Sequence, residues 1–163
     1  MKKISHEMRY DGATPEQVYA MLADPAFRAQ VCEYQRYHRH DISITPEGDG
    51  MAVVVDQHRP ADGVPAIAQK FVGAEINVHQ SEHWSSHTDA SLEVAIPGKP
   101  GHMKGTVRLA GDAGGTTETV AVDVTVSIPL VGGKIEGVLG DMLIKALDAE
   151  NTVGRQWLKG ERA

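Results

Sequence analysis

The pattern of apolar and polar positions predicts one strand and two short helices at the start of the chain. Residues 2–11 alternate between apolar and polar side chains, which is typical of a half-buried strand. The segment TPEQ at residues 14–17 has the capping threonine, the first-turn proline and the glutamine of a capping box. The pair DP at residues 24–25 restarts the helix, so we expect two short helices in succession.

The chain from residue 35 to residue 129 mostly predicts strands and turns. Glycine- and proline-rich turn signals occur at residues 46–50, 97–101 and 111–115. The strands expected around these turns lie near residues 36–45, 51–59, 74–85, 88–96, 102–110 and 116–128. Residues 61–71 break the pattern, and the spacing of their apolar positions leaves a short helix or a loop as alternatives.

A long amphipathic helix is expected at the C-terminal end, after a strand that stops at Pro129 and a glycine pair at 132–133. One apolar stripe continues from there to about Lys159. Sequential hairpins favour an antiparallel sheet, and the helix needs an apolar surface to cover. The sequence therefore predicts an α+β helix-grip fold, in which a curved antiparallel sheet of about seven strands wraps around the long helix. Residues 1–163 are expected to form a single domain.

Three segments and the order of the elements resemble a known family. The segments are VPA at residues 64–66 continuing to Phe71, EHW at residues 82–84, and VSIPLVGGKIEG, which ends at Gly137. They are similar to an uncharacterised bacterial family of the START-like, or SRPBCC, superfamily of helix-grip proteins related to the birch pollen allergen. The resemblance implies a cavity between sheet and helix, where members hold lipids, sterols, polyketides or other apolar molecules. Some members are cyclases or hydrolases, but the resemblance transfers no catalytic residue.

Composition narrows the range of partners and compartments. The formal net charge of −6 argues against binding to nucleic acid or to an anionic membrane. Stable membrane insertion is not expected, because no stretch reaches the roughly 18 apolar residues that cross a bilayer. The start of the chain lacks the apolar core of a signal peptide, and Cys32 is the only cysteine, so we expect a cytoplasmic protein.

Polar side chains on otherwise apolar strand faces are the candidates for orienting a ligand. His6 and Tyr10 share a face with apolar residues of the first strand, and His38, His40 and Gln57 do so further along. The alternative is that these groups are hydrogen-bonded locally at the rim of the sheet. Together with apolar neighbours, the predicted ligand-binding residues are His6, Met8, Tyr10, His38, His40, Val53, Val55, Gln57, Trp84, Leu92, Val94, Val107, Leu139, Met142 and Leu143.

Neither a metal site nor a catalytic nucleophile is expected. His79, His83 and His87 repeat every four residues, but in a strand this spacing separates successive residues by roughly 13 Å, too far for ligands of one ion. No Gly-x-Ser-x-Gly elbow is present, so no catalytic residue is predicted. No cofactor is expected either.

Three functions are compatible with these features. The sequence predicts that the protein binds an apolar or amphipathic small molecule, such as a lipid or polyketide, between the sheet and the C-terminal helix. One alternative is a cyclase- or dehydratase-type enzyme that uses an inward-facing histidine as acid–base group. Another is a non-catalytic interaction module with a filled core. We favour a protein that is not an enzyme, and the oligomeric state is left open.

Overall fold

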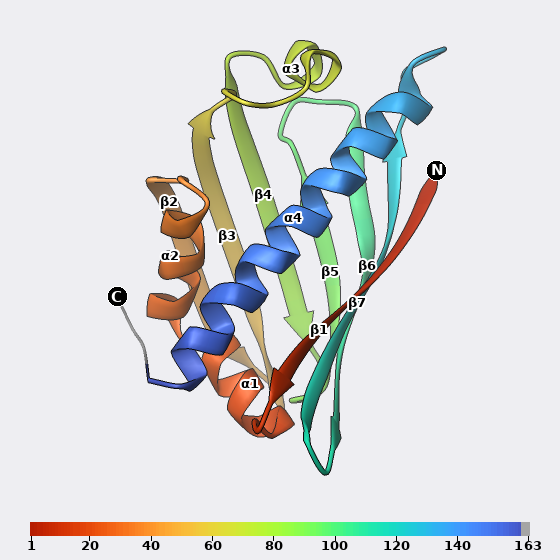
Figure 1. Cartoon of the computed structure of the whole chain (residues 1–163). Helices are drawn as coiled ribbons and strands as arrows, with labels where there is room; N and C mark the ends of the chain where they lie inside the picture. The colour runs from red at the N-terminus through yellow and green to blue at the C-terminus, as the bar shows by residue number, and fades with distance from the viewer. Residues whose placement is uncertain (161–163) are drawn as a thin grey trace.

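The computed structural model describes residues 1–160, which form one sheet and four helices (Figure 1). The strands are β1 (Lys2–Asp11), β2 (Arg39–Glu47), β3 (Gly50–Pro60), β4 (Glu75–Trp84), β5 (Asp89–Ala95), β6 (Gly101–Asp112) and β7 (Gly115–Val126). The helices are α1 (Pro15–Leu22), α2 (Pro25–Tyr34), α3 (Ala66–Val72) and α4 (Gly132–Leu158). The predicted α+β helix-grip fold is confirmed, and the segment left open between helix and loop contains the helix α3.

The sheet has seven strands in the order β1-β7-β6-β5-β4-β3-β2, and neighbouring strands pair antiparallel. The long helix α4 crosses its concave face diagonally, with α1 and α2 beside its C-terminal part and α3 near the opposite end of the sheet (Figure 1). The helix packs chiefly against β1, β7 and the shorter helices. The half of the concave face formed by β3 to β6 is therefore less closely covered by α4.

Side-chain hydrogen bonds cap the start of α1 and, separately, the start of α2, as the sequence predicts. The Thr14 hydroxyl accepts a hydrogen bond from the Gln17 amide at 3.2 Å, and the Gln17 side chain accepts one from the Thr14 amide at 2.9 Å. A carboxylate oxygen of Asp24 then accepts a hydrogen bond from the Ala26 amide at 2.9 Å and caps α2. This second start directs α2 over the concave face.

Two glycines let α4 approach β1 closely. A Cβ atom at Gly154 would lie 2.7 Å from Cε1 of Tyr10, and one at Gly140 would lie 2.5 Å from Cδ1 of Ile4. Gly137, in contrast, faces open space. The glycines at 140 and 154 thus set the position of α4 on the β1 side of the sheet. None of the helices in the described chain is long and apolar enough to span a membrane.

Candidate functional site

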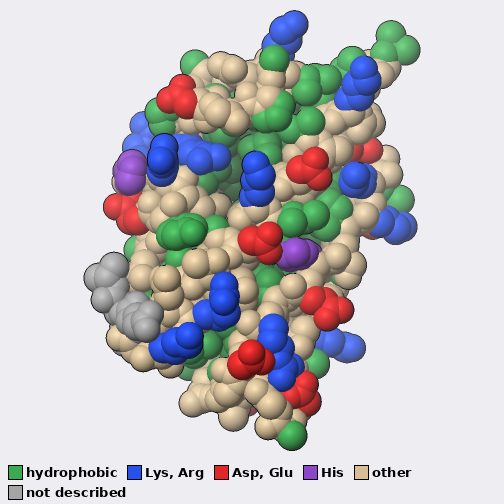
Figure 2. Space-filling model, in the orientation of Figure 1, with side chains coloured by type: hydrophobic (Ala, Val, Ile, Leu, Met, Phe, Trp, Pro, Cys, Tyr) green, Lys and Arg blue, Asp and Glu red, His purple; other side chains and the backbone are tan. Residues whose placement is uncertain are grey.

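A cavity of about 430 Å³ lies between α4, α2 and the strands β3 to β6. Its walls are mainly apolar, with Leu92 and Val94 on the sheet side and Leu139, Met142 and Leu143 on α4. Figure 2 shows the entrance as a hollow with hydrophobic side chains on its floor, beside the middle of α4. The volume falls within the range of roughly 300–1,000 Å³ that is typical of small-molecule sites.

The cavity brings together part of the predicted ligand site. Predicted residues that line it are Val55, Gln57, Leu92, Val94, Leu139, Met142 and Leu143. Predicted residues outside the lining are His6, Met8, Tyr10, His38, His40, Val53, Trp84 and Val107. Met8 and Tyr10 face the concave side, but they belong to β1, where α4 packs directly on the sheet.

The three histidines predicted to face a ligand instead interact with carboxylates near the surface. Nε2 of His6 lies 2.7 Å from a carboxylate oxygen of Asp148 on α4. His38 is exposed and lies 3.1 Å from Glu33, and His40 lies 3.8 Å from the same carboxylate. His6 and His38 thus form the local hydrogen bonds considered as the alternative, whereas His40 makes only a longer contact with Glu33. None of these three histidines lines the cavity.

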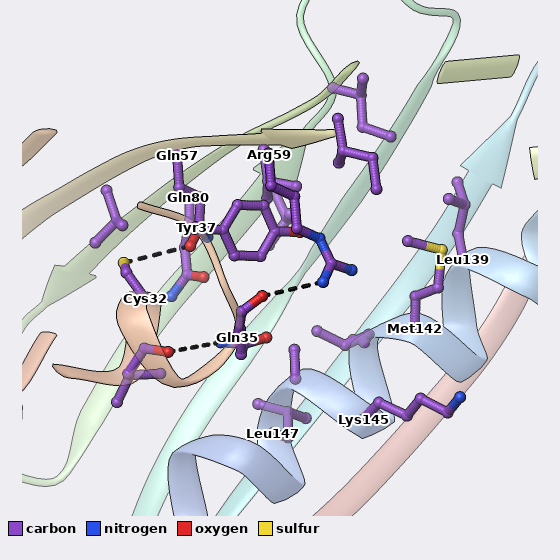
Figure 3. A pocket seen from close by; sticks show the side chains of 18 of the residues that line it. Cys32, Gln35, Tyr37, Gln57, Arg59, Gln80, Leu139, Met142, Lys145 and Leu147 are labelled. Atoms are coloured by element: carbon purple, nitrogen blue, oxygen red, sulfur yellow. Dashed lines mark hydrogen bonds between the residues drawn. The ribbon is translucent and has the colours of Figure 1, made fainter. Parts of the chain in front are cut away.

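Arg59 is a cavity residue that the sequence reasoning missed. It follows Val55 and Gln57 on the same face of β3, so extending the alternation by one step would have found it. Its Nη1 donates a hydrogen bond of 3.0 Å to the Gln35 carbonyl, and its guanidinium carbon lies 4.8 Å from the ring centre of Tyr37 (Figure 3). Burial raises the pKa of Tyr37, and the positive charge of Arg59 opposes that rise.

A buried ion pair forms another polar part of the wall. The guanidinium of Arg28, from α2, donates two hydrogen bonds of 2.8 and 2.9 Å to the carboxylate of Glu82 on β4. Gln80 and Trp84 donate further hydrogen bonds to that carboxylate at 2.6 and 2.8 Å. Burial alone would raise the pKa of Glu82, but Arg28 holds it below its usual value. Arg28 and Gln80 line the cavity, and the ion pair neutralises the arginine there.

Two further carboxyl groups interact next to this ion pair. Glu118 lies on the buried face of β7, where the Tyr10 hydroxyl donates to it at 3.4 Å, and Glu150 of α4 lines the cavity. Burial and the neighbouring Glu150 carboxyl raise the pKa of Glu118 well above its usual value. Burial likewise raises the pKa of Glu150. The pair therefore favours holding a proton, and its two groups titrate together.

A thiol also lines the cavity, that of Cys32 on α2. Burial raises the pKa of the Cys32 thiol to about 11, so the group is a neutral thiol near pH 7. Its sulfur donates a hydrogen bond of 3.4 Å to the side-chain oxygen of Gln57. Within residues 1–160, no group of three or more His, Cys, Asp or Glu side chains is arranged to hold a metal ion. The arrangement is that of an apolar chamber with a few fixed polar groups.

Solved structures share this architecture. A protein of Thermus thermophilus aligns with a TM-score of 0.66 and 15% sequence identity, covering 99% of this chain and 100% of that chain. Norcoclaurine synthase from Thalictrum flavum aligns with a TM-score of 0.59 and 12% identity, covering 93% of this chain and 85% of that one. These similarities confirm the helix-grip fold.

Sequence comparison identifies the family. The chain is 24% identical over 160 residues to an uncharacterised protein of Mycobacterium tuberculosis (strain ATCC 25618 / H37Rv), covering 91% of this chain and 92% of that protein. One protein-family sequence model matches residues 5–158, and this range includes every residue that lines the cavity. The chain therefore belongs to the family described as "Protein of unknown function (DUF2505)".

Proposed function

We propose that this protein binds an apolar or amphipathic small molecule, such as a lipid or a polyketide, in the cavity between the sheet and α4. The observation that carries the proposal is the cavity of about 430 Å³ with mainly apolar walls. Burial of a ligand's apolar surface would supply about 25 cal/mol per Å² of affinity, reduced by the cost of association. The polar groups Gln57, Arg59 and Gln80 would fix the ligand's orientation.

Structural neighbours support a binding role for this fold. Norcoclaurine synthase was crystallised in complex with dopamine and hydroxybenzaldehyde, which are small aromatic molecules. The presence of a cavity also disfavours the alternative of an interaction module with a filled core, because such a core would leave no space for a ligand.

The test uses two neighbouring valines on opposite faces of β3. Val55 lines the cavity, whereas Val54 is half-buried and does not. We expect Val55→Phe to weaken binding of the neutral fluorescent probe N-phenyl-1-naphthylamine at least about tenfold, since the added ring occupies the ligand volume. Val54→Phe should leave the affinity of the wild type unchanged.

Probe fluorescence titrations give the affinities, and circular dichroism checks that both variants are folded. Native mass spectrometry of the purified protein would in addition detect a co-purifying ligand, to be compared with the mass of a denatured sample. If the folded wild type binds no probe and carries no bound molecule, the proposed function is wrong. It is equally contradicted if Val55→Phe binds the probe as well as Val54→Phe does.

A further inference from the structure

Arg59 is a cationic side chain in the cavity wall that pairs with no carboxylate in the described part of the chain. Arg9, Arg28 and Arg39 each pair with an acidic residue within hydrogen-bond distance. Arg59 instead donates to a neutral backbone carbonyl and lies against the Tyr37 ring. Its Nε is inaccessible, but its Nη2 is not among the inaccessible atoms and donates no hydrogen bond within residues 1–160. A guanidinium with an unused donor and no carboxylate partner favours an anionic acceptor in the cavity.

The Arg59 side chain points into the cavity, where a bound ligand would accept its hydrogen bond. Figure 3 shows Arg59 extending from β3 towards α4, with its guanidinium facing Met142 across the cavity. Gln57 lies two residues earlier on the same strand face, and within residues 1–160 its amide nitrogen donates no hydrogen bond. Two groups with unused donors, one of them charged, thus face the same space from one strand.

The other charged groups around the cavity do not provide a competing partner. Glu82 already neutralises Arg28 through two hydrogen bonds. Glu150 also lines the cavity, but burial raises its pKa and favours its neutral form. Asp62 forms no ion pair with Arg59 in the described chain, and Lys145 adds a second positive charge on α4. The uncompensated charge in this part of the cavity is therefore positive, which favours an anionic ligand group.

We propose that the ligand is an amphipathic acid whose carboxylate pairs with Arg59 and accepts a hydrogen bond from Gln57. Its apolar part would lie against Leu139, Met142 and Leu143 on α4. A guanidinium matches a carboxylate through parallel hydrogen bonds, which makes an arginine better suited than a lysine to this role. The inference rests on the proposed function and adds the chemical class of the ligand.

The test compares decanoate, 1-decanol and decylamine, which have the same alkyl chain and differ in head group. Each compound is titrated against the protein loaded with N-phenyl-1-naphthylamine, and displacement of the probe is measured. We expect the wild type to bind decanoate at least about tenfold more tightly than 1-decanol, as one charge-assisted hydrogen bond allows. Decylamine should bind more weakly than 1-decanol, because its charge has the same sign as that of Arg59.

Variants of Arg59 identify the anchor. Arg59→Met should abolish the preference for decanoate over 1-decanol, and Arg59→Lys should retain part of the preference. The control Arg39→Met removes an exposed arginine that pairs with Glu75 and does not line the cavity, so it should keep the full preference. Circular dichroism checks the fold, and the head-group series on the wild type tests the inference without any variant.

Each outcome separates the inference from the proposed function. Equal affinities of the wild type for decanoate and 1-decanol would overturn the inference and leave binding in the cavity intact. Retention of the preference by folded Arg59→Met would also overturn it, because the anchor would then lie elsewhere. If the probe binds and none of the three compounds displaces it, the inference fails alone. Failure of the probe itself to bind would overturn both.

Discussion

At the scale of single residues, Glu118 and Glu150 show how burial changes the chemistry of ordinary carboxyl groups. Glu118 alternates with the buried valines of β7, and Glu150 continues the apolar stripe of α4 from Leu143 and Leu147. One oxygen of Glu150 is inaccessible to solvent and has no hydrogen-bond partner in the described chain. Because two buried negative charges side by side are unfavourable, the pair resists full ionisation.

This arrangement predicts a loss of stability above about pH 4.5, the ordinary pKa of a glutamate. The folded state raises the pKa of Glu118, so the contribution of this group to stability is complete below that pH and decreases as the pH rises towards the raised value. Glu118→Gln keeps an acceptor for Tyr10 and a donor for Glu150 without needing a proton. We expect the variant to have a higher free energy of unfolding than the wild type at pH 8 and a flatter profile.

Urea unfolding between pH 5 and pH 8.5 measures both profiles. Glu7→Gln, which removes an exposed carboxylate from β1, serves as the matched control and should follow the wild type. The lowered pKa of Glu82 affects stability only at more acidic pH, so it does not interfere in this range. A Glu118→Gln profile parallel to that of the wild type would refute the explanation.

At the scale of elements, the position of α4 determines where the cavity lies. Its glycines at 140 and 154 allow contact with β1, and the helix then stands off from β3, β4 and β5. Glycine normally weakens a helix, so its presence at a close contact has a packing reason, which is absent at Gly137.

Alanine substitutions at Gly137 and Gly154 test the difference between open space and close contact. Gly137→Ala should stabilise the protein by about 0.5–1 kcal/mol, because the added methyl meets open space and the helix gains propensity. Gly154→Ala should destabilise it by about 1–3 kcal/mol, because the methyl collides with the fixed ring of Tyr10. Chemical denaturation at one pH gives both values. Equal effects of the two substitutions would show that α4 does not depend on close contact at Gly154.

At the scale of the whole molecule, the ion pair between Arg28 and Glu82 joins the helical layer to the sheet. The two residues are separated by 54 positions in the chain, and both side chains are buried. The pair also receives hydrogen bonds from Gln80 and Trp84, so the surrounding polar groups are satisfied. Removal of one partner would leave the other charge buried without compensation.

We therefore expect Glu82→Gln to destabilise the protein by about 3–5 kcal/mol, the usual cost of breaking a buried ion pair. Glu93→Gln is the control, since Glu93 pairs with Lys104 at 3.6 Å on the exposed face of the sheet and should change stability by about 0–1 kcal/mol. Thermal and urea unfolding of both variants checks the difference. Similar values for the two would mean that the buried pair does not hold α2 to the sheet.

Most of the secondary structure was predictable, because the periods of strands and helices are properties of neighbouring residues. The alternation in β1 and β7, the capping box before α1 and the apolar stripe of α4 are visible in the printed sequence, and the structure confirms them. The same alternation identified Val55 and Gln57 as inward-facing residues, and they line the cavity.

The location of the cavity along the sheet was decided by tertiary structure alone. Met8 and Val55 have the same alternating pattern, yet the first is covered by α4 and the second lines the cavity, because the helix crosses the sheet diagonally. The local sequence predicts which face of the sheet a side chain points to. It does not predict how far away the covering element lies. The pairing of Arg28 with Glu82, and the absence of such a partner beside Arg59 among the described residues, likewise depend on residues that only the fold brings together.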